Sequence, residues 1–223
     1  WSRDGVLFLF LIGHGSYRDG VAKFMVPGPD LSADSLAVLL GRMAPPTAVL
    51  INAASSSAPF INVLSGPGRI VCTSTKSAEQ RNAPVFMEHF VGALEDGSAD
   101  GDLDERVSVY EVCTQAAALT AAWYEGENLI AVEHALLDDD GDGLGVRLGM
   151  ADASGPAAAV YLWDWPSGPT VPAIWREEYR QALDEVHQWI GRKEQIEKAV
   201  YLRRLEELLV RAARLNQRLR SED

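Results

Sequence analysis

The sequence predicts an α/β fold with a mostly parallel sheet, followed by an α-helical hairpin. Strand-like apolar runs alternate with helix-like stretches through residues 1–150, and this alternation requires crossover connections. The runs are continuously apolar, as in strands that are covered on both faces. Residues 176–220 instead carry apolar side chains at helical spacing. Residues 151–175 are rich in Pro, Gly, Ala and Trp, which is typical of a linker.

Composition limits the class of protein. The chain of 223 residues is 47% hydrophobic and 23% charged, a balance typical of a globular protein with a sizeable core. Its formal net charge of -12 disfavours nucleic acid and anionic membrane surfaces as main partners. The 2 cysteines are too few for a disulfide scaffold or a four-cysteine zinc site. Since both stand in apolar runs, we expect Cys72 and Cys113 to be buried thiols.

The sequence predicts no transmembrane helix. Its longest apolar run, Val6–Ile12, is far shorter than the ~20 residues that such a helix needs. No signal peptide is visible, and the sequence assigns no compartment. The chain starts at Trp1 rather than at an initiator methionine, so we expect the natural N-terminus to lie further upstream.

The predicted elements follow one another along residues 1–150. The first strand, Val6–Ile12, ends in Gly13-His14-Gly15. A helix begins near Ser32, and leucines at helical spacing follow it. Further strands are predicted at 47–51 and 69–73, and further helices at 84–94 and 108–124.

The C-terminal part differs from the rest in charge and in pattern. Residues 1–175 carry 9 basic and 22 acidic side chains, whereas residues 176–220 carry 11 basic and 8 acidic ones. Two apolar stripes separated by Gly191 predict two helices. The stripes consist of Leu183, Val186 and Ile190, and of Ile196, Val200, Leu205, Leu208, Leu209, Ala212 and Leu215. The helices could pack as an antiparallel pair, on each other or on the sheet, or they could form a coiled-coil homodimer.

The segment Gly13-His14-Gly15 is the first candidate for chemistry. It directly follows a buried strand, and α/β sheets gather functional groups at the carboxyl ends of their strands. Flanking glycines leave the imidazole uncrowded, as a general base or acid requires, although a histidine bonded within a tight turn explains the residues equally well. The next strand ends in the small residues 52–60, which allow a tight loop beside His14 with a hydroxyl that the imidazole could activate.

These two strand ends resemble the caspase/legumain superfamily of cysteine peptidases, and the bacterial caspase-like proteins in particular. The stretches Pro27–Leu31, Leu64–Ile70 and Glu133–Gly143 support the resemblance, which spans about residues 5–145. It implies a three-layer caspase-like sandwich with a mostly parallel sheet. Such domains begin with earlier strand–helix units that are absent here, which again predicts a truncated N-terminus.

The resemblance also implies that the peptidase nucleophile is missing. Active members carry Asp-Ala-Cys-x-Ser-Gly in the second loop, and their cysteine attacks the peptide carbonyl. The six motif positions fall here on Asn52, Ala53, Ala54, Ser55, Ser56 and Ser57. His14 is retained, but the methyl group of Ala54 cannot attack a carbonyl. Cys72 lies in a different strand and cannot replace the nucleophile.

Three interpretations of this site stay open. In the first, the peptidase site is degenerate, and the fold serves as a binding or scaffold module for a protein or peptide. In the second, an active peptidase or hydrolase uses Ser55 as nucleophile and His14 as base. Neighbouring side chains on a strand point to opposite faces, so the second requires a local distortion at Ser55. In the third, an engineered substitution of cysteine placed alanine at position 54.

A calcium-type loop is the second candidate site. Residues 100–111 resemble an EF-hand loop, with carboxylates at positions 1, 3, 5 and 12. The predicted ligands are Asp100, Asp102, Asp104, the backbone carbonyl of Arg106, Ser108 and Glu111. Glu105 departs from the pattern, since a glycine with positive φ belongs there, and we expect this to cost ~1 kcal/mol. The alternative is an acidic turn in which Ser108 and Glu111 form a capping box.

A second acidic stretch, Asp138–Gly143, repeats the opening of the same motif. Position 12 would fall on Gly149, so no carboxylate closes this loop, and we expect it to hold no metal. Residues 95–142 contain 14 acidic groups and one basic group, and a divalent cation would relieve their repulsion. The sequence therefore also allows a calcium-responsive interaction module whose helical hairpin binds a partner protein.

Overall fold

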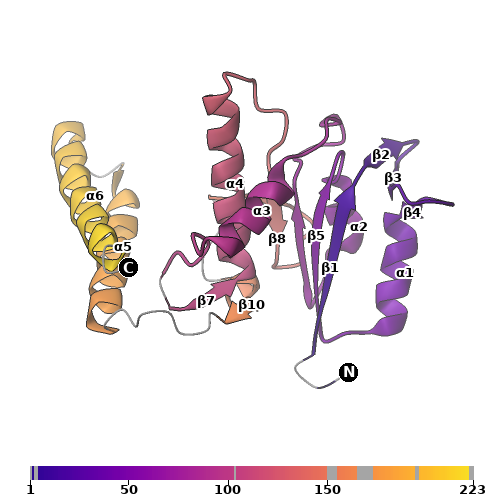
Figure 1. Cartoon of the computed structure of the whole chain (residues 1–223), viewed down its shortest axis with the longest axis horizontal. Coiled ribbons are helices and arrows are strands. Elements are labelled where there is room, and N and C mark those ends of the chain that lie inside the picture. Colours follow the sequence, from indigo (N-terminus) through magenta and orange to yellow (C-terminus); the bar gives the residue numbers. More distant parts are fainter. Residues whose placement is uncertain are drawn as a thin grey trace. The chain divides into compact units, whose positions relative to one another are not determined.

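The computed structural model describes residues 2, 5–102, 104–149, 155–164, 173–193 and 196–220 (Figure 1). The chain divides into two compact units. The first unit consists of residues 1–99 and 107–163, and the second of residues 100–106 and 164–223.

A five-stranded sheet with the order β1-β5-β6-β8-β9 forms the centre of the first unit. Strands β1 (Val6–Gly13), β5 (Thr47–Ala54) and β6 (Arg69–Thr73) pair in parallel, at the three positions where the sequence predicts strands. Strand β8 (Leu136–Asp138) runs antiparallel to β6, and β9 (Val146–Arg147) runs antiparallel to β8. Four of the five strands therefore share one direction, which confirms the predicted α/β class with a mostly parallel sheet.

Helices cover both faces of this sheet. Helices α1 (Ala33–Met43) and α2 (Pro59–Leu64) pack on one face, and α3 (Phe86–Glu95) and α4 (Val109–Gly126) pack on the other (Figure 1). Side chains of a strand alternate between its faces, so Leu50 belongs to the α1–α2 core while the neighbouring residue belongs to the α3–α4 core. The unit thus has three layers, in the order helix, sheet, helix.

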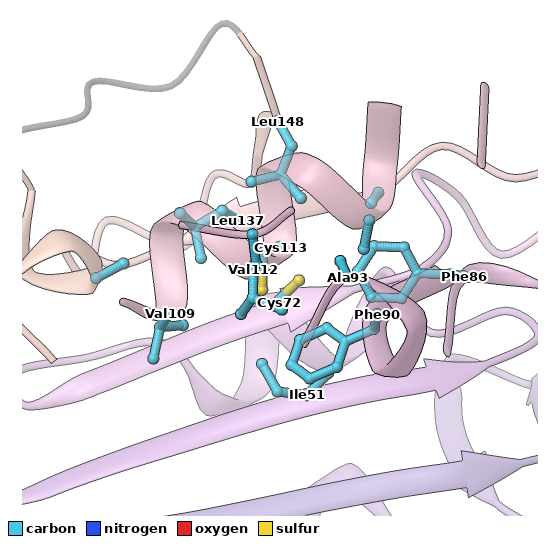
Figure 2. Packing of buried hydrophobic residues seen from close by; sticks show 14 of the residues in the cluster. Ile51, Cys72, Phe86, Phe90, Ala93, Val109, Val112, Cys113, Leu137 and Leu148 are labelled. Carbon is cyan, nitrogen blue, oxygen red and sulfur yellow. The ribbon is translucent and has the colours of Figure 1, made fainter. Parts of the chain in front are cut away.

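The α3–α4 core contains both cysteines (Figure 2). Cys72 of β6 and Cys113 of α4 are free, buried and in contact with each other, as thiols rather than as a disulfide. Burial, followed by the contact with Cys72, raises the pKa of the Cys113 thiol well above its ordinary value. The sequence prediction of two buried thiols is confirmed.

A small antiparallel sheet, which the sequence analysis did not predict, follows His14. It consists of β2 (Gly15–Arg18), β3 (Val21–Phe24) and β4 (Leu31–Ser32). The turn between β2 and β3 has φ angles of 52° at Asp19 and 78° at Gly20, both positive as a type I′ hairpin turn requires. The Met25 amide donates to the His14 carbonyl at 2.9 Å, which ties the hairpin to the end of β1.

The predicted linker at residues 151–175 is partly built into the first unit. Pro156–Ala158 forms a short 3₁₀ helix, and Ala157 is buried in the core against α4. Strand β10 (Tyr161–Asp164) pairs with β7 (Arg106–Ser108). The first unit therefore reaches residue 163 instead of ending at residue 150, while residues 165–172 of the predicted linker lie outside the described residues.

The second unit contains the predicted pair of helices, α5 (Ala173–Ile190) and α6 (Lys198–Arg220). They run antiparallel, since Arg211 pairs with Glu185 at 2.8 Å while the later Asn216 donates to the earlier Tyr179 at 2.9 Å. The buried side chains of their seam are Tyr179, Ala182, Val186, Tyr201, Leu208 and Ala212.

Parts of the two predicted stripes do not belong to this seam. Ile190, Val200 and Leu209 are exposed in the described chain, and the side chain of Leu183 lies outside the described residues. Tyr201, which the stripes omit, fills the seam and stacks on Trp189 with ring centroids 6.3 Å apart. Two helices that face only each other bury one narrow seam each, so the broader apolar stripes are left partly exposed. The homodimer stays a prediction.

Candidate functional site

The two loops with candidate catalytic residues lie side by side at the carboxyl ends of β1 and β5. The strands pair in parallel, with Gly13 opposite Ala54. Beyond this pair, the Ser55 hydroxyl donates to the Gly15 carbonyl and accepts from the Gly15 amide, both at 3.1 Å. The fold therefore brings the loop that carries His14 against the loop that carries the motif position of the nucleophile.

Gly15 is fixed by the close approach of the two loops. A Cβ atom at this position would overlap the Ser55 carbonyl oxygen and would lie 3.3 Å from the Ala54 Cβ. Only glycine allows a backbone to approach another so closely. Steric exclusion therefore explains why residue 15 is a glycine. The Ala54 methyl group lies next to the loop that carries His14.

The Ser55 hydroxyl already has partners. Ser55 is buried, and its only hydroxyl proton is donated to the Gly15 carbonyl. A general base must reach that proton in order to activate the oxygen. His14 is exposed, and its imidazole has no hydrogen-bond partner among the described residues. The hydrogen bond of a Ser–His dyad is thus not made in this arrangement.

The serines that follow close the loop from within. The Ser57 hydroxyl accepts from the Thr75 amide at 3.2 Å, and the Ser74 hydroxyl donates to the Ala54 carbonyl at 3.1 Å. The Ser56 hydroxyl donates to the Ala78 carbonyl at 2.8 Å. These bonds join the loop after β5 to the loop after β6. We name the serines and threonines at positions 55–57 and 73–75, whose hydroxyls all have hydrogen-bond partners, the hydroxyl network.

Asn52 stands at the position of the motif aspartate and is fully buried. Its Oδ1 accepts from the Ala54 amide at 3.1 Å, which fixes the bend at the end of β5. Its Nδ2 has no partner in the described part of the chain. A buried unpaired donor costs about 1–3 kcal/mol.

The two acidic loops share one local geometry. The carboxylate oxygens of Asp100, Asp102 and Asp104 lie within 4.8 Å of one another, as do those of the second set, and either set could hold a metal ion. The second set consists of Asp138, Asp140 and Asp142. The sequence analysis expected the second loop to hold no metal, yet its carboxylates are grouped as closely as those of the first.

The backbone of the two loops follows the same course. In each loop the first aspartate accepts from the amide at position 6, and the third and fifth loop residues accept from amides two residues further on. The φ angles at position 6 are 68° for Glu105 and 79° for Gly143. Glu105 thus makes the turn for which the motif uses glycine, at a backbone cost of ~1 kcal/mol.

Glu111, the predicted closing ligand, forms the capping box of α4. Its carboxylate accepts from the Ser108 amide at 2.8 Å and from the Ser108 hydroxyl at 2.7 Å, and the Glu111 amide donates back to Ser108 Oγ at 3.2 Å. This confirms the capping box that the sequence analysis gave as the alternative. A calcium ion closed by Glu111 would compete for this carboxylate.

Glu133 is a buried carboxylate that the sequence analysis included only as part of the stretch Glu133–Gly143. It is buried, and it accepts from the amides of Val85 at 2.8 Å and Phe86 at 3.3 Å and from the Tyr124 hydroxyl at 3.2 Å. It therefore caps the start of α3, where no local side chain does so. Burial raises the pKa of Glu133, while burial followed by the charge of Glu133 raises the pKa of Tyr124 to about 12.

Comparisons of the chain with protein-family models, with curated proteins and with solved structures found no match. No helix in the described ranges combines the length and the apolar character that crossing a membrane requires.

Proposed function

We propose that the first unit is a caspase/legumain-like domain that has lost its peptidase nucleophile and serves as a binding or scaffold module for a protein or peptide. One observation carries this proposal. Ala54, at the motif position of the nucleophile, ends β5 directly opposite the end of β1, where Gly13-His14-Gly15 begins. A buried methyl group beside a retained histidine is the arrangement expected when only the nucleophile has been replaced.

Two further features support a module without catalysis. The Ser55 hydroxyl donates to a backbone carbonyl rather than to an imidazole, so the nearest hydroxyl is not activated. The hydroxyl network holds the rest of the loop closed through buried side-chain bonds. Hydroxyls that are bonded in this way stabilise the loop, and their protons are already donated.

The most direct test introduces a thiol at residue 54 through the substitution Ala54→Cys. If His14 faces the introduced thiol, iodoacetamide should alkylate it with a half-maximal rate below pH ~8.5, the ordinary thiol value. Adding His14→Ala should move that pH upward, because the imidazolium no longer stabilises the thiolate. The wild-type chain gives the background from Cys72 and Cys113, which are buried. Equal pH profiles with and without His14 would contradict the proposed lineage.

The catalytic alternative has its own test. A folded wild-type chain should not react with a fluorophosphonate probe and should not hydrolyse fluorogenic peptides. Labelling of the wild type that Ser55→Ala abolishes would overturn the loss of catalysis and favour the serine hydrolase instead.

A second proposal is that the two acidic loops bind calcium. It is supported by the carboxylate oxygens that lie within 4.8 Å of one another in each loop and by the shared backbone course of the two loops. Calcium at ~100 times its dissociation constant should raise the free energy of unfolding by about 2.7 kcal/mol per site. Titration calorimetry should find two sites in the wild type, and one each in Asp102→Asn/Asp104→Asn and Asp140→Asn/Asp142→Asn. No heat and no shift in Tm at 10 mM calcium, an excess over the ~1 mM affinities of weak calcium modules, would remove this proposal.

A further inference from the structure

A pocket of about 190 Å³ lies on the α4 side of the sheet, and its lining residue His134 is joined through Gln80 to the loop that carries Ala54. Helix α4 forms one wall, and the segment that leads into β8 and the end of β9 form the other. A water molecule occupies ~30 Å³ in the liquid, so the pocket has room for a ligand of a few non-hydrogen atoms. Alanines are the most frequent residue type in its lining, and they provide apolar surface with short side chains.

Two threonine hydroxyls beside the pocket are buried without a hydrogen-bond partner in the described part of the chain. Thr114 and Thr120 both line the pocket from α4, and the Oγ1 atom of each is buried without a hydrogen bond in the described part of the chain. Thr120 is only 5% exposed, so bulk water does not satisfy its hydroxyl. Buried polar groups of folded proteins nearly always have a hydrogen-bond partner, and an unpaired group indicates a partner such as a ligand or an ordered water.

His134 offers a third donor to the same pocket. The Gln80 Oε1 accepts from the Lys76 amide at 2.7 Å, so the amide nitrogen of Gln80 faces His134 and donates to its Nδ1 at 2.7 Å. A neutral imidazole that accepts at Nδ1 carries its proton on Nε2. Burial, followed by the charges of Lys76 and Arg147, lowers the pKa of His134 and keeps the ring neutral. The free Nε2–H is therefore a donor.

The charges of the lining favour an anion. Arg147 lines the pocket and is close enough to act on His134. The one acidic lining group, Glu133, already accepts three hydrogen bonds from Val85, Phe86 and Tyr124, and it faces the amides that start α3. The unsatisfied groups are thus donors or hydroxyls, beside a guanidinium that can bind a carboxylate with two parallel bonds.

We propose that this pocket binds a small carboxylate with a short apolar body, held by Arg147 and the His134 Nε2–H. The alanines contact the apolar body, and the two donors bind the carboxylate end. The ligand could be a free short-chain acid or an acidic side chain or C-terminus of a peptide. The site does not depend on whether the peptidase-like loop is catalytic.

Titration calorimetry and NMR of the full chain with sodium propionate test the proposal, with sodium phosphate and propionamide as comparisons. Propionate should bind, while propionamide, which has the same shape without charge, should bind at least tenfold more weakly. Arg147→Gln should weaken propionate binding at least tenfold. Arg42→Gln removes an arginine from α1, on the opposite face of the sheet, and should change nothing.

The outcomes separate clearly. A short peptide that ends in an aspartate and binds more tightly than propionate would identify a peptide as the source of the carboxylate. Phosphate binding as tightly as propionate, or equal affinities in Arg147→Gln and Arg42→Gln, would overturn the proposal. The His134 ring signals, followed by NMR, should shift with propionate in the wild type, and the absence of any shift would also overturn it.

Discussion

The hydroxyl network beside Ala54 and the pocket along α4 are both rich in polar side chains, yet they treat these groups in opposite ways. In the network, each serine or threonine hydroxyl bonds to a backbone group or to another hydroxyl. Beside the pocket, the hydroxyls of Thr114 and Thr120 are buried without partners in the described part of the chain. Polar groups that satisfy one another stabilise a fold, whereas a buried group left unpaired destabilises it. By this measure the hydroxyls of the loop that carries Ala54 contribute to stability, whereas the two threonine hydroxyls of α4 do not.

Glu133 belongs to the pocket lining but is satisfied, so its removal should have the largest effect on stability. Glu133→Ala leaves the Val85 and Phe86 amides and the Tyr124 hydroxyl unpaired, and should lower the free energy of unfolding by about 3 kcal/mol. Urea unfolding measures it. Tyr124→Phe, which removes one of the three bonds, is the matched control and should cost less than half as much. Equal effects of the two variants would contradict the capping role.

Gly15→Ala tests how tightly the peptidase-like loop is closed. The added Cβ would overlap the Ser55 carbonyl oxygen, so we expect a loss of about 2 kcal/mol in the free energy of unfolding. Gly92→Ala in α3 is the control, because its Cβ meets no atom within 4 Å and a helical alanine should gain ~0.5–1 kcal/mol. A neutral Gly15→Ala would mean that the two loops can separate, which would reopen the serine hydrolase.

The contrast between paired and unpaired hydroxyls can be measured directly with two substitutions. Ser57→Ala leaves the buried Thr75 amide without its acceptor and should cost about 1–2 kcal/mol. Thr120→Val keeps the shape of the side chain and breaks no hydrogen bond, so it should be neutral or stabilising by a few tenths of a kcal/mol. Denaturant unfolding of both variants under one condition gives the comparison. The reverse order of effects would refute it.

The smallest expected effect is a dependence on pH at His134. Its pKa in the folded chain lies below the ordinary value, so the folded state binds fewer protons than the unfolded state. The stability that this group contributes is present above pH ~6.5 and is lost as the pH falls through the lower folded value. Between pH 7 and 5 the free energy of unfolding should therefore decline less in His134→Gln than in the wild type. We expect a difference of ~1 kcal/mol or less. An unchanged slope would show that the ring is not buried as described.

The elements with strong local signals could be predicted from the sequence. The strands at Val6, Thr47 and Arg69 begin where continuous apolar runs begin, because a strand covered on both faces has no polar side to interrupt the run. The capping box at Ser108 was predictable, since both of its partners lie within one helical turn. The hairpin after His14 was not predicted, although its turn signal, Asp19-Gly20, is present in the sequence.

By itself the sequence determined that the chain is α/β, that a C-terminal pair of helices follows, and that residue 54 is an alanine without a thiol group. These are properties of composition and of neighbours along the chain. Only the tertiary structure decided that Ser55 bonds to Gly15, that Glu133 caps α3 from 47 residues further along, and that two threonines of α4 share a pocket with His134. Such contacts depend on where distant segments meet, and hydrogen bonds between them leave no periodic pattern in the sequence.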